Sequence, residues 1–75
     1  MQTLREARAA RVLTIRELAA LAGVSTRTIV QVEAGQIVPR FATLKKIASA
    51  LGVEPAAITE FAHAIEEAGK EEAAA

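Results

Sequence analysis

Apolar and polar residues recur with a helical period between Ser25 and Gly35. At ~100° per residue, Ile29 and Val32 fall on one side of a helix, whereas a guanidinium and an amide side chain fall on the other. Ser25 can accept hydrogen bonds from amides of the first turn, and Gly35 suits the left-handed residue that often ends a helix. The pattern therefore predicts a capped helix of about three turns with one packed face and one exposed face.

The same reasoning predicts four further helices. Thr14 and Glu17 have the spacing of a capping box, so a helix is expected from Ile15 to Ala22. Gly23 permits a sharp turn between this helix and the next, and Pro55 suits the first position of the last helix. The remaining helices are expected from residue 4 to residue 11, from residue 41 to residue 51, and from about residue 55 onward.

The composition places these helices in one small domain. The 75 residues are 52% hydrophobic but only 3% aromatic, so the core must consist mainly of Ala, Leu, Ile and Val. A chain of this size buries only about 60% of its unfolded surface, which makes close helix packing necessary. We expect an all-α domain over residues 1–68 and a frayed, acidic, Ala-rich tail over residues 69–75, where no apolar period continues.

Charge is distributed unevenly although the formal net charge is zero. Residues 1–50 carry eight Arg or Lys and three Glu, a balance of +5, and residues 51–75 carry one Lys and six Glu, a balance of −5. This asymmetry is typical of a basic binding face followed by a solvated acidic tail. Solvent-exposed charged faces in both halves would also produce it.

Several classes of protein are excluded by what the sequence lacks. Without Cys there is no disulfide framework, no thiolate nucleophile and no Cys-based zinc site. His63 is the single histidine and has no second ligand at a useful spacing, so neither a metal nor another cofactor is expected, and no catalytic constellation suggests an enzyme. No apolar run approaches the ~18 residues of a membrane span, so we expect a cytoplasmic protein without a membrane partner.

The exposed face of the helix after Ser25 carries Arg27 and Gln31. Arg and Gln are side chains that contact guanine and adenine edges through paired hydrogen bonds in the major groove. This face therefore predicts a contact with double-stranded DNA, with association at the nucleoid. The alternative is that both residues are ordinary solvated side chains.

A longer pattern extends through the chain and reads Leu13-Thr14-x-x-Glu17-Leu18-Ala19-x-x-Ala22-Gly23-Val24-Ser25-x-x-Thr28-Ile29-x-x-Val32-Glu33-x-Gly35, followed by Pro39, Leu44, Ile47, Ala48, Leu51 and Gly52-Val53. It resembles the Cro and phage-repressor type of helix-turn-helix domain, also called the XRE family, over roughly residues 4 to 62. The resemblance implies a compact five-helix, lambda-repressor-like fold. Its second and third helices form the helix-turn-helix, and the third lies in the DNA major groove.

The resemblance also implies which residues contact DNA. The base-reading positions of the family fall on Thr26, Arg27 and Gln31. Contacts with the DNA backbone, made by side chains and by free amides at helix N-termini, fall on Ile15, Ser25, Thr28, Arg40 and Lys45.

A structural ion pair is implied as well. On the helical wheel Glu33 lies ~40° from Ile29 and borders the packed face, where an unpaired carboxylate would be costly. The family commonly pairs this Glu with an Arg in the first helix, and that position is Arg8 here. We therefore expect an ion pair between Arg8 and Glu33.

Two apolar surfaces are candidates for joining two copies of the chain. Ile37 and Val38 are more apolar than a solvated loop requires, and Phe61 and Ile65 belong to the apolar stripe of the last helix. Packing of Ile65 on Leu4 within one copy is the alternative for that residue. A homodimer is expected because a single small module buries too little surface for tight specific DNA binding.

These observations favour a sequence-specific transcriptional regulator, a repressor that binds an inverted repeat as a homodimer. The alternative is a protein-interaction module, such as an antitoxin, that keeps the same fold and uses the acidic fifth helix to bind a toxin or a co-regulator. DNA binding through phosphate contacts would weaken steeply with salt, which distinguishes the two hypotheses.

Overall fold

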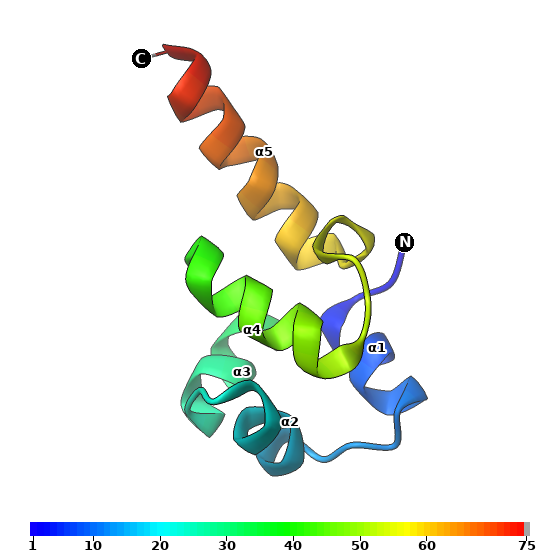
Figure 1. The fold of residues 1–75 in the computed structure, drawn as a ribbon. Coiled ribbons are helices and arrows are strands. Elements are labelled where there is room, and N and C mark those ends of the chain that lie inside the picture. The colour runs from blue at the N-terminus through cyan, green and yellow to red at the C-terminus, as the bar shows by residue number, and fades with distance from the viewer. Residues whose placement is uncertain (75) are drawn as a thin grey trace.

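The computed structural model describes the backbone of residues 1–74 and the side chains of residues 1–66. Within that part the fold is all-α, as predicted. The elements in chain order are α1 (Leu4–Ala10), α2 (Ile15–Ala22), α3 (Thr26–Glu33), α4 (Phe41–Leu51), the 3₁₀ turn η1 (Pro55–Ala57) and α5 (Thr59–Ala74). Figure 1 shows α1 to α4 gathered into one body, from which α5 extends.

The predicted turn between α2 and α3 forms at Gly23. Its φ of 71° is left-handed, and its N–H donates to the carbonyl oxygen of Ala20 at 3.3 Å. A Cβ built on Gly23 would meet nothing within 4 Å. Glycine is therefore favoured here by the left-handed backbone conformation, and not by a lack of space for a side chain.

Apolar side chains from every helix form one core. α4 supplies the largest share and packs mainly against α2, while Ile29 and Val32 attach α3 to the same cluster without any exposure. The buried members are Leu4, Ala7, Leu18, Ala19, Ala22, Ile29, Val32, Leu44, Ile47, Ala48, Leu51, Ile58, Phe61 and Ala64.

The place of Phe61 in this core corrects one expectation. We expected Phe61 to contribute to a surface between two copies of the chain. Its exposed fraction is 0%, and it is the largest of the fully buried side chains in the described part. Because α5 packs against α4, the ring lies inside a single copy, and Phe61 cannot form a dimer surface in this fold.

The fifth helix starts later than the proline suggests. Pro55 begins only the short η1 turn, and Ile58 after it is extended, with φ −97° and ψ 124°. The N–H of Gln2 donates to Ala57 O at 3.0 Å, and the N–H of Thr59 donates to Gln2 O at 2.7 Å. These bonds pair the chain near its N-terminus with Ile58 as an isolated β-bridge, which delays the helix until Thr59.

The other end of α5 reaches beyond the boundary expected at residue 68. Its backbone is helical through Gly69 to Ala74. The side chains of the predicted tail, residues 69–75, lie outside the described residues. The division into a domain and a frayed tail therefore stays a prediction.

Val12 ends α1 in a conformation that valine rarely adopts. Its φ is 54°, and its N–H donates to Ala9 O at 2.9 Å, while the N–H of Leu13 donates to Arg8 O at 3.2 Å. This is the hydrogen-bond pattern of a Schellman motif, which usually has glycine at the left-handed position. A β-branched residue there costs on the order of 1–3 kcal/mol. The Val12 side chain is 87% exposed, so no packing within this chain offsets the strain.

Candidate nucleic-acid interface

The first turn of α3 is held by the hydroxyl groups of Ser25 and Thr28. Ser25 Oγ accepts a hydrogen bond from the backbone N–H of Thr28 at 3.1 Å, and the two side-chain hydroxyls lie 2.8 Å apart. The amides of Thr26 and Arg27, which precede the first intrahelical bond, have no acceptor within the helix. Capping thus fixes the turn while amides remain directed toward any anion in front of it.

The exposed face of α3 differs in one respect from the wheel prediction. Thr26 and Arg27, which are predicted to contact bases, are exposed. Gln31, at the edge of the face, is half-buried and so less exposed than the wheel predicts. Val30, for which no contact is predicted, is 47% exposed. Arg27 and Val30 are therefore more exposed to solvent on this face than Gln31 is.

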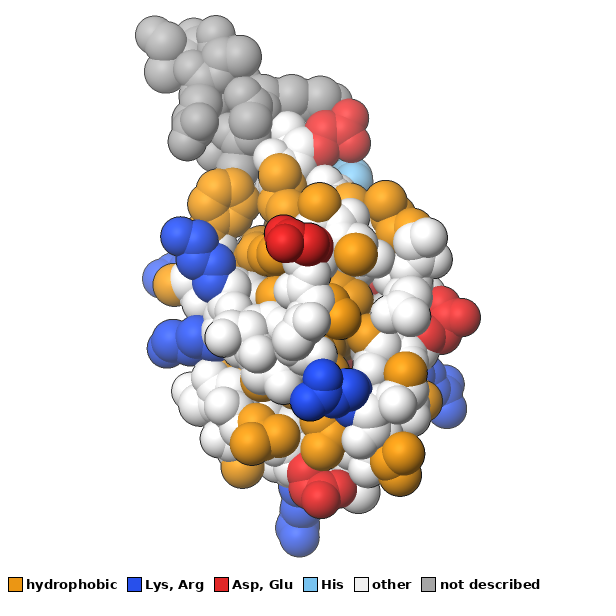
Figure 2. All heavy atoms as spheres, turned by 45° about the vertical axis from the view of Figure 1, so that its right-hand side comes forward, with side chains coloured by type: hydrophobic (Ala, Val, Ile, Leu, Met, Phe, Trp, Pro, Cys, Tyr) orange, Lys and Arg blue, Asp and Glu red, His pale blue; other side chains and the backbone are white. Residues whose placement is uncertain are grey.

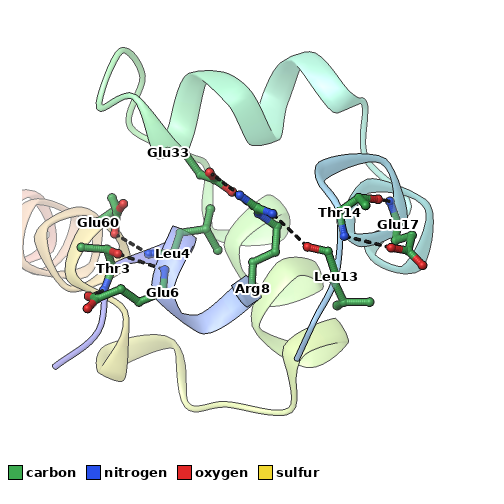
Figure 3. A network of polar contacts seen from close by, with 9 residues as sticks. All are labelled: Thr3, Leu4, Glu6, Arg8, Leu13, Thr14, Glu17, Glu33 and Glu60. Atoms are coloured by element: carbon green, nitrogen blue, oxygen red, sulfur yellow. Dashed lines mark hydrogen bonds and ion pairs between the residues drawn. The ribbon is translucent and has the colours of Figure 1, made fainter. Parts of the chain in front are cut away.

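The ion pair between α1 and α3 forms as expected. Arg8 Nε donates to Glu33 Oε2 at 2.7 Å, and Arg8 Nη2 donates to Glu33 Oε1 at 3.2 Å. The remaining terminal nitrogen, Nη1, donates to the carbonyl oxygen of Leu13 at 2.8 Å, as Figure 3 shows. The side chains of Arg8 and Glu33 are only 15% and 10% exposed.

The electrostatics of this pair favour the charged form of Arg8. The hydrogen bonds to the Glu33 carboxylate raise the pKa of Arg8, against the opposing effect of burial. A bidentate pair of this kind is stronger and more directional than a single contact between charges. It attaches the end of α3 to α1 and so restricts the orientation of the exposed face.

The N-terminus of α2 presents backbone and a basic side chain. Thr14 and Glu17 form the predicted capping box, with Glu17 N–H to Thr14 Oγ1 at 3.0 Å and Thr14 N–H to Glu17 Oε1 at 2.9 Å. The Thr14 backbone N–H, followed by its hydroxyl, lowers the pKa of Glu17. The side chain of Ile15 packs against the core, so only its amide can face an anion. Arg16, which directly follows Ile15, is exposed and adds a positive charge beside that amide, although the sequence pattern does not single it out.

Two further basic residues predicted to contact the DNA backbone lie in and before α4. Arg40 occupies the N-cap position of that helix, is exposed, and makes no capping hydrogen bond with its side chain. Lys45 is exposed one turn into the helix. The guanidinium of Arg40 therefore has no role in capping α4.

The loop between α3 and α4 carries exposed apolar side chains. Ile37 is 38% exposed and Val38 is 61% exposed, and Phe41 just after the loop, which the sequence did not single out, is 43% exposed. Ile37 and Val38 line a cavity of about 440 Å³ together with Gly35, Thr59, Glu60 and His63. The loop and the first turns of α5 thus form one concave apolar surface, whereas Ile65 farther along α5 is half-buried.

Glu60 has a structural role that the sequence did not reveal. Its Oε1 accepts a hydrogen bond from the backbone N–H of Leu4 at 3.0 Å, at the first turn of α1. A carboxylate at a helix N-terminus satisfies a free amide and interacts favourably with the helix dipole. Glu60 is therefore engaged within the chain.

No group of three or more His, Cys, Asp or Glu residues among those described could hold a metal ion. Among the same residues, no helix is long and apolar enough to cross a membrane. Figure 2 shows apolar side chains spread over one face of the described residues, with basic side chains at its edges and near its lower centre.

The chain is similar to known helix-turn-helix proteins. A family described as "Helix-turn-helix" matches residues 4–58. The chain is 47% identical over 53 residues to a protein of Bacillus subtilis (strain 168) described as the uncharacterized HTH-type transcriptional regulator RghRB. That match covers 69% of this chain and 38% of the relative. No solved structure matches the chain.

Proposed function

Because the chain belongs to the helix-turn-helix family, we propose that it is a transcriptional regulator that contacts the major groove of double-stranded DNA with α3. The observation that carries the proposal is the division of α3 into two faces. Ile29 and Val32 are fully buried and Glu33 is fixed by Arg8, while Thr26 and Arg27 are exposed. An exposed, well-anchored helix face with a guanidinium is what base contact requires.

In this proposal Arg27 contacts a guanine, Gln31 contacts an adenine, and Thr26 contacts a thymine methyl or a phosphate. The phosphate contacts come from the α2 and α3 N-termini and from basic side chains. They involve the amides and hydroxyls at Ile15, Ser25 and Thr28, and the charges of Arg40 and Lys45. Arg16 adds a charge at the α2 N-terminus, where Ile15 offers only its amide.

We further propose that two copies bind an inverted repeat and repress transcription at the nucleoid, in the cytoplasm. The half-sites of such a repeat lie about 34 Å apart. The concave apolar surface formed by Ile37 and Val38 with the start of α5 supports a contact between copies, because exposed apolar side chains there gain from burial. Ile65, half-buried on the same helix, can extend that contact.

One observation favours a second candidate function. The 440 Å³ cavity between the loop and α5 could also receive a side chain of another protein, such as a toxin or a co-regulator. In that case the fold would act as a protein-interaction module, and the exposed Glu66 and the acidic residues after it would contribute charge.

Selection of bound duplexes from a random pool at two salt concentrations tests the proposal. We expect one enriched motif with two-fold symmetry, and an affinity that falls by about 0.9 log unit per log unit of salt for each phosphate contacted. A pool without any enriched sequence, or an affinity insensitive to salt, would overturn the regulator hypothesis and favour the protein-interaction module.

A further inference from the structure

Val30 occupies the middle of the exposed face of α3, although no contact was expected for it. Taking ~100° per residue, Val30 lies 40° from Thr26 and 60° from Arg27, between them on the helix surface. Its exposed fraction is 47%, whereas Ile29 and Val32 on the opposite face have none. Val30 thus places a large apolar side chain on the same exposed face of α3 as Arg27.

We propose that Val30 recognises the C5-methyl group of a pyrimidine in the major groove, that of thymine in ordinary DNA. This inference rests on the proposed function, since it requires that α3 enters the groove. The thymine methyl is the apolar group that the major-groove edges of the base pairs present, and apolar side chains contact it. A purely polar face would leave that methyl without a partner.

The shape of valine suits this task. A β-branched side chain in a helix has one strongly preferred χ1 rotamer, so its two methyl groups are already positioned before DNA binds. Little side-chain freedom is then lost on contact. The orientation of these methyl groups is also fixed, because α3 is held against the core by Ile29 and Val32 and joined to α1 by the Arg8–Glu33 pair.

The position of Val30 relative to Arg27 predicts where the methyl lies. Three residues along a helix correspond to about 4.5 Å of rise. Successive bases on one strand are about 3.4 Å apart. Val30 therefore reaches a base about one step from the base that Arg27 contacts, and the recognised sequence contains a thymine next to the G·C pair specified by Arg27.

Replacement of single thymines by deoxyuridine, which lacks only the methyl group, tests the inference. The duplex is the motif selected by the wild-type protein, and the probe is that duplex with one thymine replaced at a time. We expect about fourfold weaker binding at one position, the effect of losing one buried methyl group. That position lies beside the G·C pair at which the Arg27→Ala variant has a weaker base preference than the wild-type protein.

The variant Val30→Ala identifies the side chain responsible. It should bind the thymine and deoxyuridine duplexes almost equally, because the contacting methyl groups are gone, and its unfolding should stay close to wild type because Val30 is exposed. Val12→Ala removes the same methyl groups outside α3 and should keep the fourfold difference.

The outcomes separate the two proposals. If no duplex is selected, the proposed function itself fails. If a motif is selected but no thymine beside the Arg27-dependent pair is sensitive to its methyl group, the inference about Val30 is overturned. It is equally overturned if Val30→Ala retains the sensitivity to deoxyuridine.

Discussion

Arg8 and Glu33, 25 residues apart, are joined by two parallel hydrogen bonds, from Nε to Oε2 at 2.7 Å and from Nη2 to Oε1 at 3.2 Å. The pair links the first helix to the end of α3. Since Arg8 also donates to Leu13 O, one guanidinium joins α1, the turn after it and α3. The orientation of the proposed DNA-contacting face thus depends on a contact outside that face.

Removal of one partner of this pair should destabilise the fold. Glu33→Ala leaves a guanidinium that is only 15% exposed without its carboxylate, and we expect a loss of about 2–3 kcal/mol in the free energy of unfolding. Urea denaturation measures it. The control is Arg5→Ala, which removes an exposed arginine from α1, the helix that also carries Arg8. It should change stability by less than about 0.5 kcal/mol. Equal stability of Glu33→Ala and wild type would contradict a structural role for the pair.

Acid should weaken the capping boxes. Hydrogen bonds from Thr14 lower the pKa of Glu17 below its ordinary value of 4.5, so the carboxylate stabilises the fold above that pH. The stabilisation is lost as the pH falls through the lower folded-state pKa. We expect Glu17→Gln to lose less stability than wild type between pH 7 and pH 3 in urea titrations. Glu54→Gln, at an exposed position without a capping bond, is the control for the removal of a surface carboxylate.

Relief of backbone strain should make the protein more stable. Val12→Gly removes the strain of valine at φ 54°, and the gain exceeds the extra chain entropy of glycine, leaving about 1 kcal/mol. A higher thermal midpoint would show it. The matched control is Ala10→Gly, at the last residue of α1, which should lower stability by less than about 1 kcal/mol. A Val12→Gly protein no more stable than wild type would mean that the strain is negligible.

Arg27 should determine one base pair of the recognised sequence. We expect Arg27→Ala to weaken binding of the selected duplex by about 1–3 kcal/mol and to relax the preference at one G·C pair. Lys45→Ala, which removes a charge without a base contact, should weaken binding about equally for all sequences and reduce the salt slope by about 1. Competition with single-base variants of the duplex distinguishes the two patterns. If Arg27→Ala selects the wild-type motif, the assignment of the base-contacting face is wrong.

The loop between α3 and α4 should control dimerisation. Val38→Glu places a charge in the proposed contact and should shift the protein to monomers in sedimentation experiments. Relative to wild type, it should lose more affinity for the full repeat than for a single half-site. Leu21→Glu is the control, because Leu21 is 63% exposed on α2, much as Val38 is 61% exposed. A Val38→Glu protein with the wild-type association state would exclude this surface.

The sequence by itself determined the helices and, for α2 and α3, their ends. α2 and α3 lie where their apolar periods and caps predicted them, because capping boxes and αL residues act over three or four neighbouring positions. It also determined which face of α3 is packed. The ion pair could not be predicted from the helical period alone. The period places Glu33 at the border of the packed face, whereas only the family resemblance identifies Arg8 of α1 as its partner.

Only the tertiary structure decided the features that depend on distant parts of the chain. The start of α5 depends on Gln2, 57 residues from Thr59, and Glu60 satisfies the amide of Leu4, 56 residues away. Phe61 is buried because α5 packs against α4, and the partial burial of Gln31 leaves Val30 more prominent. The physical reason is that a helical period specifies which side of a helix is apolar, whereas the exposure of each residue is set by the neighbouring elements that the fold places against it.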